Sequence, residues 1–163
     1  MNIIVNVSKN WAIGKDNGLL FHLSQDMKFF KSHTQGKTVV MGRKTLESLP
    51  GGNPLPNRRN IVLTRDKNFT KEGVTVYHSI EELLQNIGVA ESIDTYIIGG
   101  ESIYRELAPY CSIAYVTKVD AEAEGADAFM VNLDSDPTWK VTDESEDLEE
   151  KGYKFKFVTY EHE

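Results

Sequence analysis

TVVMGRKTLESL, residues 38–49, joins one strand directly to one helix. Its first four residues are β-branched or apolar, as is typical of a buried strand. Gly42 breaks this strand, and RKTLESL then begins a short helix. A strand that leads straight into a helix is the first half of a crossover between parallel strands. The segment therefore predicts a parallel sheet with helices packed on it.

The same alternation of strand and helix runs outward from this segment. Strands are expected at residues 2–7, 60–64, 74–77 and 95–98, and helices from Ser24 to about His33, at 80–87 and at 101–107. Two further stretches of strand composition, 112–119 and 153–160, have no helix between them. We expect a single α/β domain over residues 1–163, with a mostly parallel mixed sheet, an antiparallel C-terminal hairpin and four flanking helices.

Composition excludes several classes of protein. A chain of 163 residues that is 40% hydrophobic and 26% charged can bury one core. Cys111 is the only cysteine and the four histidines show no ligand spacing, so we expect neither a disulfide framework nor a metal site. No apolar run reaches the length of a membrane span, and no basic segment followed by an apolar one opens the chain. We therefore expect a cytoplasmic protein without a membrane partner.

The charge is distributed unevenly along the chain. Residues 1–119 hold 14 Lys and Arg against 11 Asp and Glu, whereas residues 120–163 hold 4 against 14. An acidic chain with a pI near 5.1 is a poor partner for nucleic acid. Any bound anion should therefore be small and lie in the first two-thirds of the chain. The acidic stretch Asp143–Glu150 is interpreted as a solvated loop or turn.

One carboxylate, Asp26, lies among apolar and aromatic residues in GKDNGLLFHLSQDMKFFK, residues 14–31. Ser24 is the expected helix N-cap, and Phe29 and Phe30 then share the helix face of Asp26. A carboxylate that faces aromatic rings loses hydration, which raises its pKa and suits it to proton transfer or to binding an amidine-like heterocycle. The alternative is an ordinary acid of the first helical turn, where the macrodipole favours negative charge.

Three strand ends carry groups that suit an anion. Gly42 is followed by Arg43, Lys44 and Thr45 at a helix start, where cations oppose the macrodipole unless an anion binds. Thr64 and Arg65 follow the third strand, and Gly99-Gly100 follows the fifth. Together they indicate a ligand with at least two phosphate-like groups, although neither GxGxxG nor a Walker A loop is present.

Six segments of the chain match one known family in order and spacing. They are IIVNVSKNWAIGKDNGLLFHL, SQDMKFFK, VVMGRKTLESL, PLPNRRNIVLT, YIIGGESIY and AYVTKVDAEAEG. Over essentially its whole length the chain resembles the dihydrofolate reductases of the bacterial chromosomal type. The resemblance implies an eight-stranded mixed sheet and an NADPH-dependent oxidoreductase of tetrahydrofolate biosynthesis and one-carbon metabolism. It also implies a monomeric target of antifolates that reduces 7,8-dihydrofolate by hydride transfer with protonation of N5.

The resemblance assigns the substrate side of the site. Asp26 would bind the amidine-like edge of the pteridine and promote protonation with Thr117, and Phe21 completes the catalytic set. Arg58 would receive the α-carboxylate of the glutamate tail, where a bidentate guanidinium fits, whereas Arg59 would be a surface or cofactor-side charge. The substrate-binding residues implied in full are Ile4, Asn6, Asp26, Met27, Phe30, Leu49, Leu55, Arg58, Ile98 and Thr117.

The resemblance also assigns the cofactor side and makes NADPH the expected cofactor. Arg43, Thr64 and Arg65 would hold the 2′-phosphate, and Lys44 and Thr45 with residues 99–102 would hold the pyrophosphate. The cofactor-binding residues implied in full are Asn6, Ala12, Ile13, Gly14, Gly18, Leu19, Gly42, Arg43, Lys44, Thr45, Leu63, Thr64, Arg65, His78, Ile98, Gly99, Gly100, Glu101, Ser102, Ile103 and Tyr104. The loop from Gly14 to Leu20 would be a lid between cofactor and substrate.

Several positions depart from the family pattern. Phe21 stands where many bacterial relatives have tryptophan, and Asn6 adds a polar group that needs a partner. Ser24 replaces a usual proline. In EGADAF, residues 124–129, Asp127 is displaced by one place from the aspartate that in the family steadies the lid.

Two other functions compete with this interpretation. A reductase of the same fold could act on another heterocycle, such as a pyrimidine of riboflavin synthesis, but Asp26 together with Arg58 argues against it. A serine hydrolase or a plain nucleotide-binding module is the more distant alternative. Gly100-Glu101-Ser102 resembles a nucleophile elbow, yet Tyr104 occupies the place of the last glycine of GxSxG.

Overall fold

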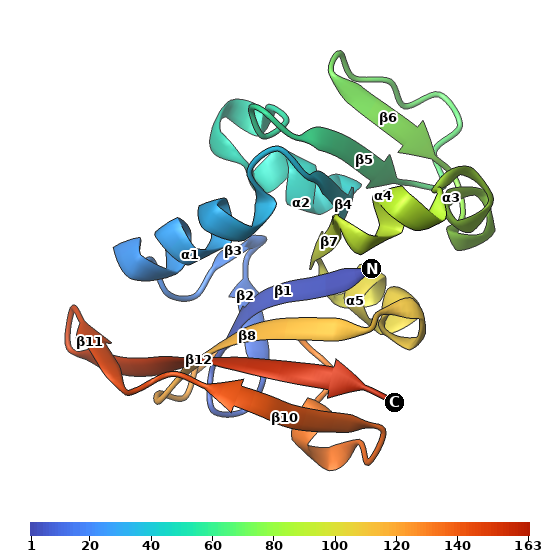
Figure 1. The fold of residues 1–163 in the computed structure, drawn as a ribbon. Helices are drawn as coiled ribbons and strands as arrows, with labels where there is room; N and C mark the ends of the chain where they lie inside the picture. The colour runs from blue at the N-terminus through green and yellow to red at the C-terminus, as the bar shows by residue number, and fades with distance from the viewer.

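A computed structural model describes all residues from Met1 to Glu163. Its large sheet has the strand order β10-β12-β8-β1-β7-β4-β5-β6, and short β11 pairs with β12 at one end. In Figure 1 the sheet extends from β10 at the bottom of the view to β6 at the top. Its strands are β1 Asn2–Val7, β4 Thr38–Gly42, β5 Arg59–Leu63, β6 Val74–Tyr77, β7 Thr95–Gly99, β8 Ile113–Val119, β10 Trp139–Glu144, β11 Leu148–Glu150 and β12 Tyr153–His162.

The strand directions confirm the predicted mixed sheet. All pairs among β1, β4, β5, β6, β7 and β8 are parallel. The pairs that involve β12 are antiparallel. The change of direction falls where the chain has no helix between two strands, because only antiparallel neighbours can do without a long crossover.

Five α-helices flank the sheet, one more than predicted. They are α1 Ser24–Thr34, α2 Arg43–Ser48, α3 Ile80–Asn86, α4 Val89–Ile93 and α5 Glu101–Leu107. The additional helix, α4, has five residues, too few to show a helical period. Short 3-10 helices occur at Pro50–Gly52, Ala108–Tyr110 and Leu133–Ser135. None of the helices is long and apolar enough to cross a membrane.

Alternation along the strands divides the core between the two faces of the sheet. On β1, Ile3 belongs to the larger hydrophobic cluster and Ile4 to a second one. The larger cluster is covered by α3 and α5, through residues such as Leu83 and Leu107. The second cluster lies under α1 and α2, through Phe30 and Leu46 with their neighbours. Asp26 therefore lies in the first turn of a helix that covers the second face.

Two segments interpreted as loops, the opening loop and the acidic stretch 143–150, contain strands. The opening loop and the EGADAF segment form a small second sheet of β2 Ala12–Lys15, β3 Gly18–Leu19 and β9 Ala128–Phe129. The acidic stretch 143–150, predicted as a solvated loop, instead includes the end of β10 and all of β11. Its acidic side chains are compatible with edge strands because one side of each such strand faces water.

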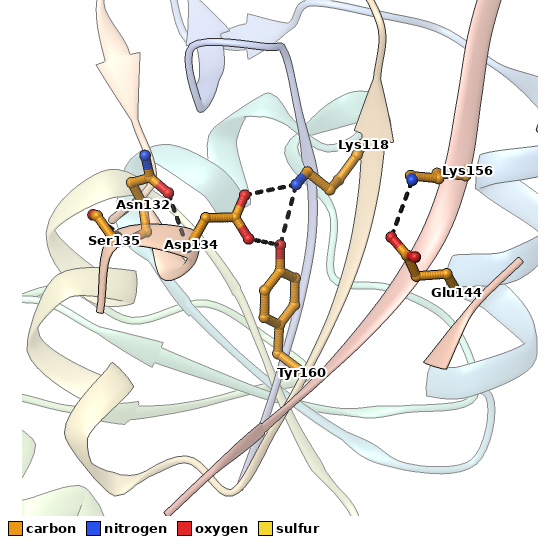
Figure 2. A network of polar contacts seen from close by, with 7 residues as sticks. All are labelled: Lys118, Asn132, Asp134, Ser135, Glu144, Lys156 and Tyr160. Atoms are coloured by element: carbon orange, nitrogen blue, oxygen red, sulfur yellow. Dashed lines mark hydrogen bonds and ion pairs between the residues drawn. The ribbon is translucent and has the colours of Figure 1, made fainter. Parts of the chain in front are cut away.

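A polar network fastens the loop before β10 to the sheet, as Figure 2 shows. The Lys118 ammonium on β8 donates to Asp134 at 2.7 Å and to the Tyr160 hydroxyl oxygen at 3.2 Å. The Tyr160 hydroxyl on β12 donates to Asp134 at 2.6 Å. Lys118 also lies 5.4 Å from the centre of the Trp11 ring, next to the start of β2. These contacts anchor the segment before β2 and the segment after β9, two ends of the small second sheet.

Candidate active site

Asp26 lies in the first turn of α1, where two neighbouring strands of the sheet reach it. Asn6 on β1 and Thr117 on β8 are direct partners in register, so their side chains lie on the same face of the sheet. The Asn6 amide donates to Asp26 Oδ2 at 2.9 Å, and the Thr117 hydroxyl donates to Oδ1 at 2.6 Å. Asn6 thus has the partner that its polar group requires, and each carboxylate oxygen receives one donor.

The surroundings raise the pKa of Asp26, as the sequence predicted. Loss of hydration is the largest cause, and the negative charge of Glu150 adds to it. The hydrogen bonds from Asn6 and Thr117 act in the opposite direction, because they stabilise the ionised carboxylate. A carboxyl group with a raised pKa keeps its proton closer to neutral pH and can serve in acid-base chemistry.

The start of α1 corrects one prediction. Ser24 is not the N-cap: the helix begins at Ser24, Leu23 occupies the cap position, and no side chain of this segment caps it. Instead the Glu150 carboxylate accepts hydrogen bonds from the backbone N–H groups of Ser24, at 2.6 Å, and Gln25, at 3.1 Å. A carboxylate far away in the sequence therefore takes over the role expected of the serine hydroxyl.

Apolar side chains surround the substrate side of this site. Of the six residues expected to form its apolar walls, Ile4, Phe30, Leu49, Leu55 and Ile98 join the same hydrophobic cluster. The exception is Met27, whose side chain is 60% exposed and lies outside this cluster. The structure therefore gathers five of the six predicted wall residues in one cluster, which includes Phe30 of the helix that carries Asp26.

Arg58 has an unused donor. Its Nε is buried without a hydrogen-bond partner, and Nη2 donates to Gln35 at 3.2 Å. The guanidinium carbon lies 5.9 Å from the centre of the Phe30 ring, and burial lowers the pKa of Arg58. An orphan guanidinium N–H fits a carboxylate ligand. Arg59, in contrast, has a side chain that is 41% exposed and pairs with Glu91.

The three predicted anion-binding segments lie next to one another at the carboxyl ends of their strands. They follow β4, β5 and β7, which are adjacent parallel strands in the order β7-β4-β5. Arg43 donates to Asp66 at 2.9 Å and its guanidinium lies 4.6 Å from the centre of the Phe69 ring. Arg65 is exposed, and His78 Nδ1 lies 2.9 Å from the carbonyl oxygen of Thr64. The carboxyl ends of β4 and β5 thus carry hydroxyl and guanidinium groups, and His78, which follows the neighbouring β6, adds an imidazole.

The Gly99-Gly100 turn allows a close approach of neighbouring atoms. Gly99 has a φ of +124°, and a Cβ there would lie 3.3 Å from the Tyr104 ring. A Cβ on Gly100 would lie 3.5 Å from Thr45 Oγ1, so the turn and the first turn of α2 are adjacent. On α5, Ser102 is exposed, whereas Ile103 and Tyr104 are buried in the core. Leu63 is also a core residue.

The small second sheet places the expected lid beside two of the predicted anion-binding segments. Ala12, Ile13 and Gly14 lie on β2, and Gly18 and Leu19 form β3. The Asn17 amide donates to the carbonyl oxygen of Lys44 at 2.9 Å. The Glu101 carboxylate accepts a hydrogen bond of 2.6 Å from the N–H of Phe129 on β9. The lid thus contacts the start of α2, and its partner strand contacts the start of α5.

Comparison with known proteins shows which family this chain belongs to. Residues 1–162 match the family model described as dihydrofolate reductase. The chain belongs to the dihydrofolate reductase family. Curated dihydrofolate reductases of Staphylococcus haemolyticus and Bacillus subtilis (strain 168) are 38% and 39% identical to it, over 99% of this chain and 95% and 94% of theirs.

A solved structure that is similar to this chain is also a dihydrofolate reductase. It is the dihydrofolate reductase from Enterococcus faecalis complexed with NADP(H) and RAB-propyl. It superposes with a TM-score of 0.86 at 34% identity, covering 99% of this chain and 95% of that one. The fold and the order of the strands therefore belong to a family of NADPH-dependent oxidoreductases.

Two of the residues that depart from the dihydrofolate reductase pattern make contacts that the structure shows. The displaced Asp127 still contacts the lid: its Oδ2 accepts from the N–H of Asp16 at 3.0 Å, and its N–H donates to the Gly14 carbonyl at 3.1 Å. Phe21 packs in a separate cluster with Leu23, Val119 and Phe155.

Sequence reasoning missed two carboxylates at the borders of the site, Glu150 and Asp66, and the backbone contact of a third, Glu101. Glu150 caps α1, Asp66 pairs with Arg43, and Glu101, expected only as a cofactor contact, binds the backbone of β9. Each acts through a backbone amide or a side chain distant in sequence. For Glu150 the only signal was the acidic stretch 143–150, which is equally typical of a solvated surface.

Proposed function

We propose that the protein reduces 7,8-dihydrofolate to 5,6,7,8-tetrahydrofolate with NADPH and that Asp26 assists the protonation of N5. The observation that carries this proposal is the Asp26 carboxylate, half-buried in α1 and hydrogen-bonded to Asn6 and Thr117. Membership of the dihydrofolate reductase family supports the reaction, and the raised pKa of Asp26 supports its role.

Asp26 would bind the amidine-like edge of the pteridine. A carboxylate accepts two parallel hydrogen bonds from such an edge, and in its protonated form it can pass a proton onward. Thr117, 1% exposed and fixed on β8, orients the carboxylate through the bond to Oδ1. Asn6 does the same at Oδ2. The two strand residues therefore hold the acid in place before the substrate arrives.

Arg58 would select the glutamate tail of the substrate. Its buried Nε has no partner within the protein, and a planar guanidinium can bind a carboxylate with two parallel bonds. The distance of 5.9 Å between the Phe30 ring and the guanidinium carbon places an apolar surface beside it for the aryl part of the tail.

The residues at the carboxyl ends of β4, β5 and β7 would hold NADPH. Arg43, Thr64 and Arg65 suit the 2′-phosphate, and Lys44 and Thr45 beside the Gly99-Gly100 turn suit the pyrophosphate. NADPH, when bound, supplies the hydride for C6 of the pteridine. The lid strands β2 and β3 would exclude water from the reacting atoms.

The test is to mix purified protein, NADPH and dihydrofolate and to follow the absorbance of NADPH. We expect a loss of absorbance that requires both dihydrofolate and active protein. Absence of any dihydrofolate-dependent loss would contradict the proposal. Arg58→Ala should raise the KM for dihydrofolate by about tenfold or more without changing the KM for NADPH. Arg59→Ala is the matched control, because its side chain pairs with Glu91, and it should change neither.

A further inference from the structure

The tip of the β11–β12 hairpin lies against the junction between the lid and α1. Two residues, Lys151 and Gly152, connect the strands, and both have positive φ values, of 54° and 81°. Glu150 and Tyr153 on either side of this turn are partners in register. In Figure 1, β11 and the start of α1 lie on the same side of the molecule.

Three residues of the hairpin tip contact the chain just before and within the first turn of α1. The Glu150 carboxylate binds the N–H groups of Ser24 and Gln25. The Lys151 ammonium donates to the carbonyl oxygen of His22 at 2.7 Å. The Tyr153 ring meets the Phe21 ring edge-on, with 5.0 Å between centres. The tip therefore holds the segment from residue 21 to residue 25 by polar contacts and by packing.

The Glu150 contact is the one that acts directly on the helix. The first N–H groups of any helix lack partners within it, and a carboxylate satisfies them with charge-assisted bonds. No side chain of its own segment caps α1, so Glu150 is the group that fixes its first turn. Asp26 is the next residue after the two that Glu150 binds.

We propose that Glu150 is a positioning residue of the reaction, which fixes the first turn of α1 and so holds Asp26 against Asn6 and Thr117. This inference rests on the proposed function, because it assigns Glu150 a role through Asp26. The two acids act in opposite ways at the same helix end: Glu150 stays ionised as the cap, and its charge disfavours ionisation of Asp26.

The charged and titratable groups around Asp26 come from few elements. Glu150 lies on β11, and Tyr104 on α5 is buried with its hydroxyl donating to the Ile4 carbonyl at 2.8 Å. Asn6 and Thr117 on β1 and β8 are uncharged. Lys28 and Lys31 on α1 are exposed. Glu150 is thus the charged group whose removal should most clearly alter the protonation of Asp26.

Glu150→Gln removes the charge and leaves one accepting oxygen where the carboxylate uses two, so the contact that fixes the first turn of α1 is weakened. The measurement is the rate of hydride transfer in a single turnover as a function of pH. Asp26 then ionises more easily, so the decline of the rate with rising pH should move to lower pH, and the rate at neutral pH should fall about threefold or more. The KM for NADPH should not change. Glu149→Gln, on the same strand but exposed, is the control and should match the parent protein.

A second pair of variants separates positioning from a general loss of stability. In an Asp26→Asn background, Glu150→Gln should cause no further shift of the pH profile, since the group it acts on is gone. The same shift in that background, or a Glu150→Gln profile identical to that of the parent, would overturn the inference. If Asp26→Asn itself retained full activity, the proposed function would fail instead, so the two failures are distinguishable.

Discussion

The proposed substrate side and the proposed cofactor side of the site differ in how deeply their charged groups are buried. Asp26 is fixed by donors from two central strands, and one of them, Thr117, is 1% exposed. Arg43, the corresponding charged group on the cofactor side, pairs with Asp66, and their side chains are 41% and 45% exposed. The proposed substrate side is thus held by a buried and a half-buried residue of the sheet, whereas the proposed cofactor side is a set of solvated charges.

This difference in exposure predicts how each side of the site responds to substitution. Interactions among exposed charges are weak and are screened by salt, and their partners exchange easily. A hydrogen bond to a desolvated carboxylate is stronger, and its loss alters the pKa of the group that remains. Variants on the substrate side should therefore change the pH dependence of the reaction, and variants on the cofactor side should change affinity and its dependence on salt.

The largest effect is expected from Asp26→Asn. The amide keeps the shape of the side chain but cannot carry the proton, so turnover at neutral pH should fall about a hundredfold or more. Part of the rate should return in acid, where solvent protonates the substrate directly. Steady-state rates from acid to alkaline pH check this. A variant with the rate and profile of the parent protein would remove Asp26 from the mechanism.

Arg43→Ala should come next in size. Loss of a charge-assisted bond of about 2 kcal/mol corresponds to roughly thirtyfold weaker binding of NADPH. NADH lacks the 2′-phosphate, so its affinity should hardly change. Titrations of both cofactors at low and high salt provide the measurement. Equal losses for the two cofactors would place the 2′-phosphate elsewhere on the protein.

Asn6→Ala should have a moderate effect with a defined sign. The Asn6 amide stabilises the ionised form of Asp26, so its removal raises the pKa of Asp26 further. The protonated form then persists to higher pH, and the decline of the rate should shift in the alkaline direction, opposite to the shift expected for Glu150→Gln. Single-turnover rates across the pH range test this, and a shift toward acid would show that the assigned role of the bond is wrong.

Asp66→Asn should have the smallest effect. Asparagine can still accept the hydrogen bond from the N–H of Asn68 that shapes this turn, but it no longer neutralises Arg43. The affinity for NADPH should rise about threefold, with a change in the free energy of unfolding below about 0.5 kcal/mol. Cofactor titration and thermal unfolding measure both. Weaker NADPH binding would mean that Asp66 is needed to orient Arg43.

The sequence predicted those parts of the molecule that depend on local patterns. The strands at residues 2–7 and 74–77 have the expected bounds, and α3 begins at residue 80 as expected, capped by Ser79, which accepts from the N–H of Glu82. Periodicity and capping act within a few residues, so they can be read along one chain.

What the sequence did not predict depends on contacts between distant segments. Glu150 lies more than a hundred residues from the helix it caps, and nothing local favours it over the serine at the start of α1. Pairing of β2 with β9 joins two short segments without a strand pattern of their own. The Asn6 amide was recognised as needing a partner, but only the register between β1 and β8 shows why that partner is shared with Thr117.

The most direct measurement is an NMR titration of the Asp26 carboxyl carbon in the protein without ligands. A desolvated carboxylate held by two donors and facing Glu150 should titrate above the ordinary range for aspartate. The midpoint should move higher in Asn6→Ala and lower in Glu150→Gln. A midpoint within or below the ordinary range, unmoved by either substitution, would contradict the claim that the fold prepares Asp26 for proton transfer.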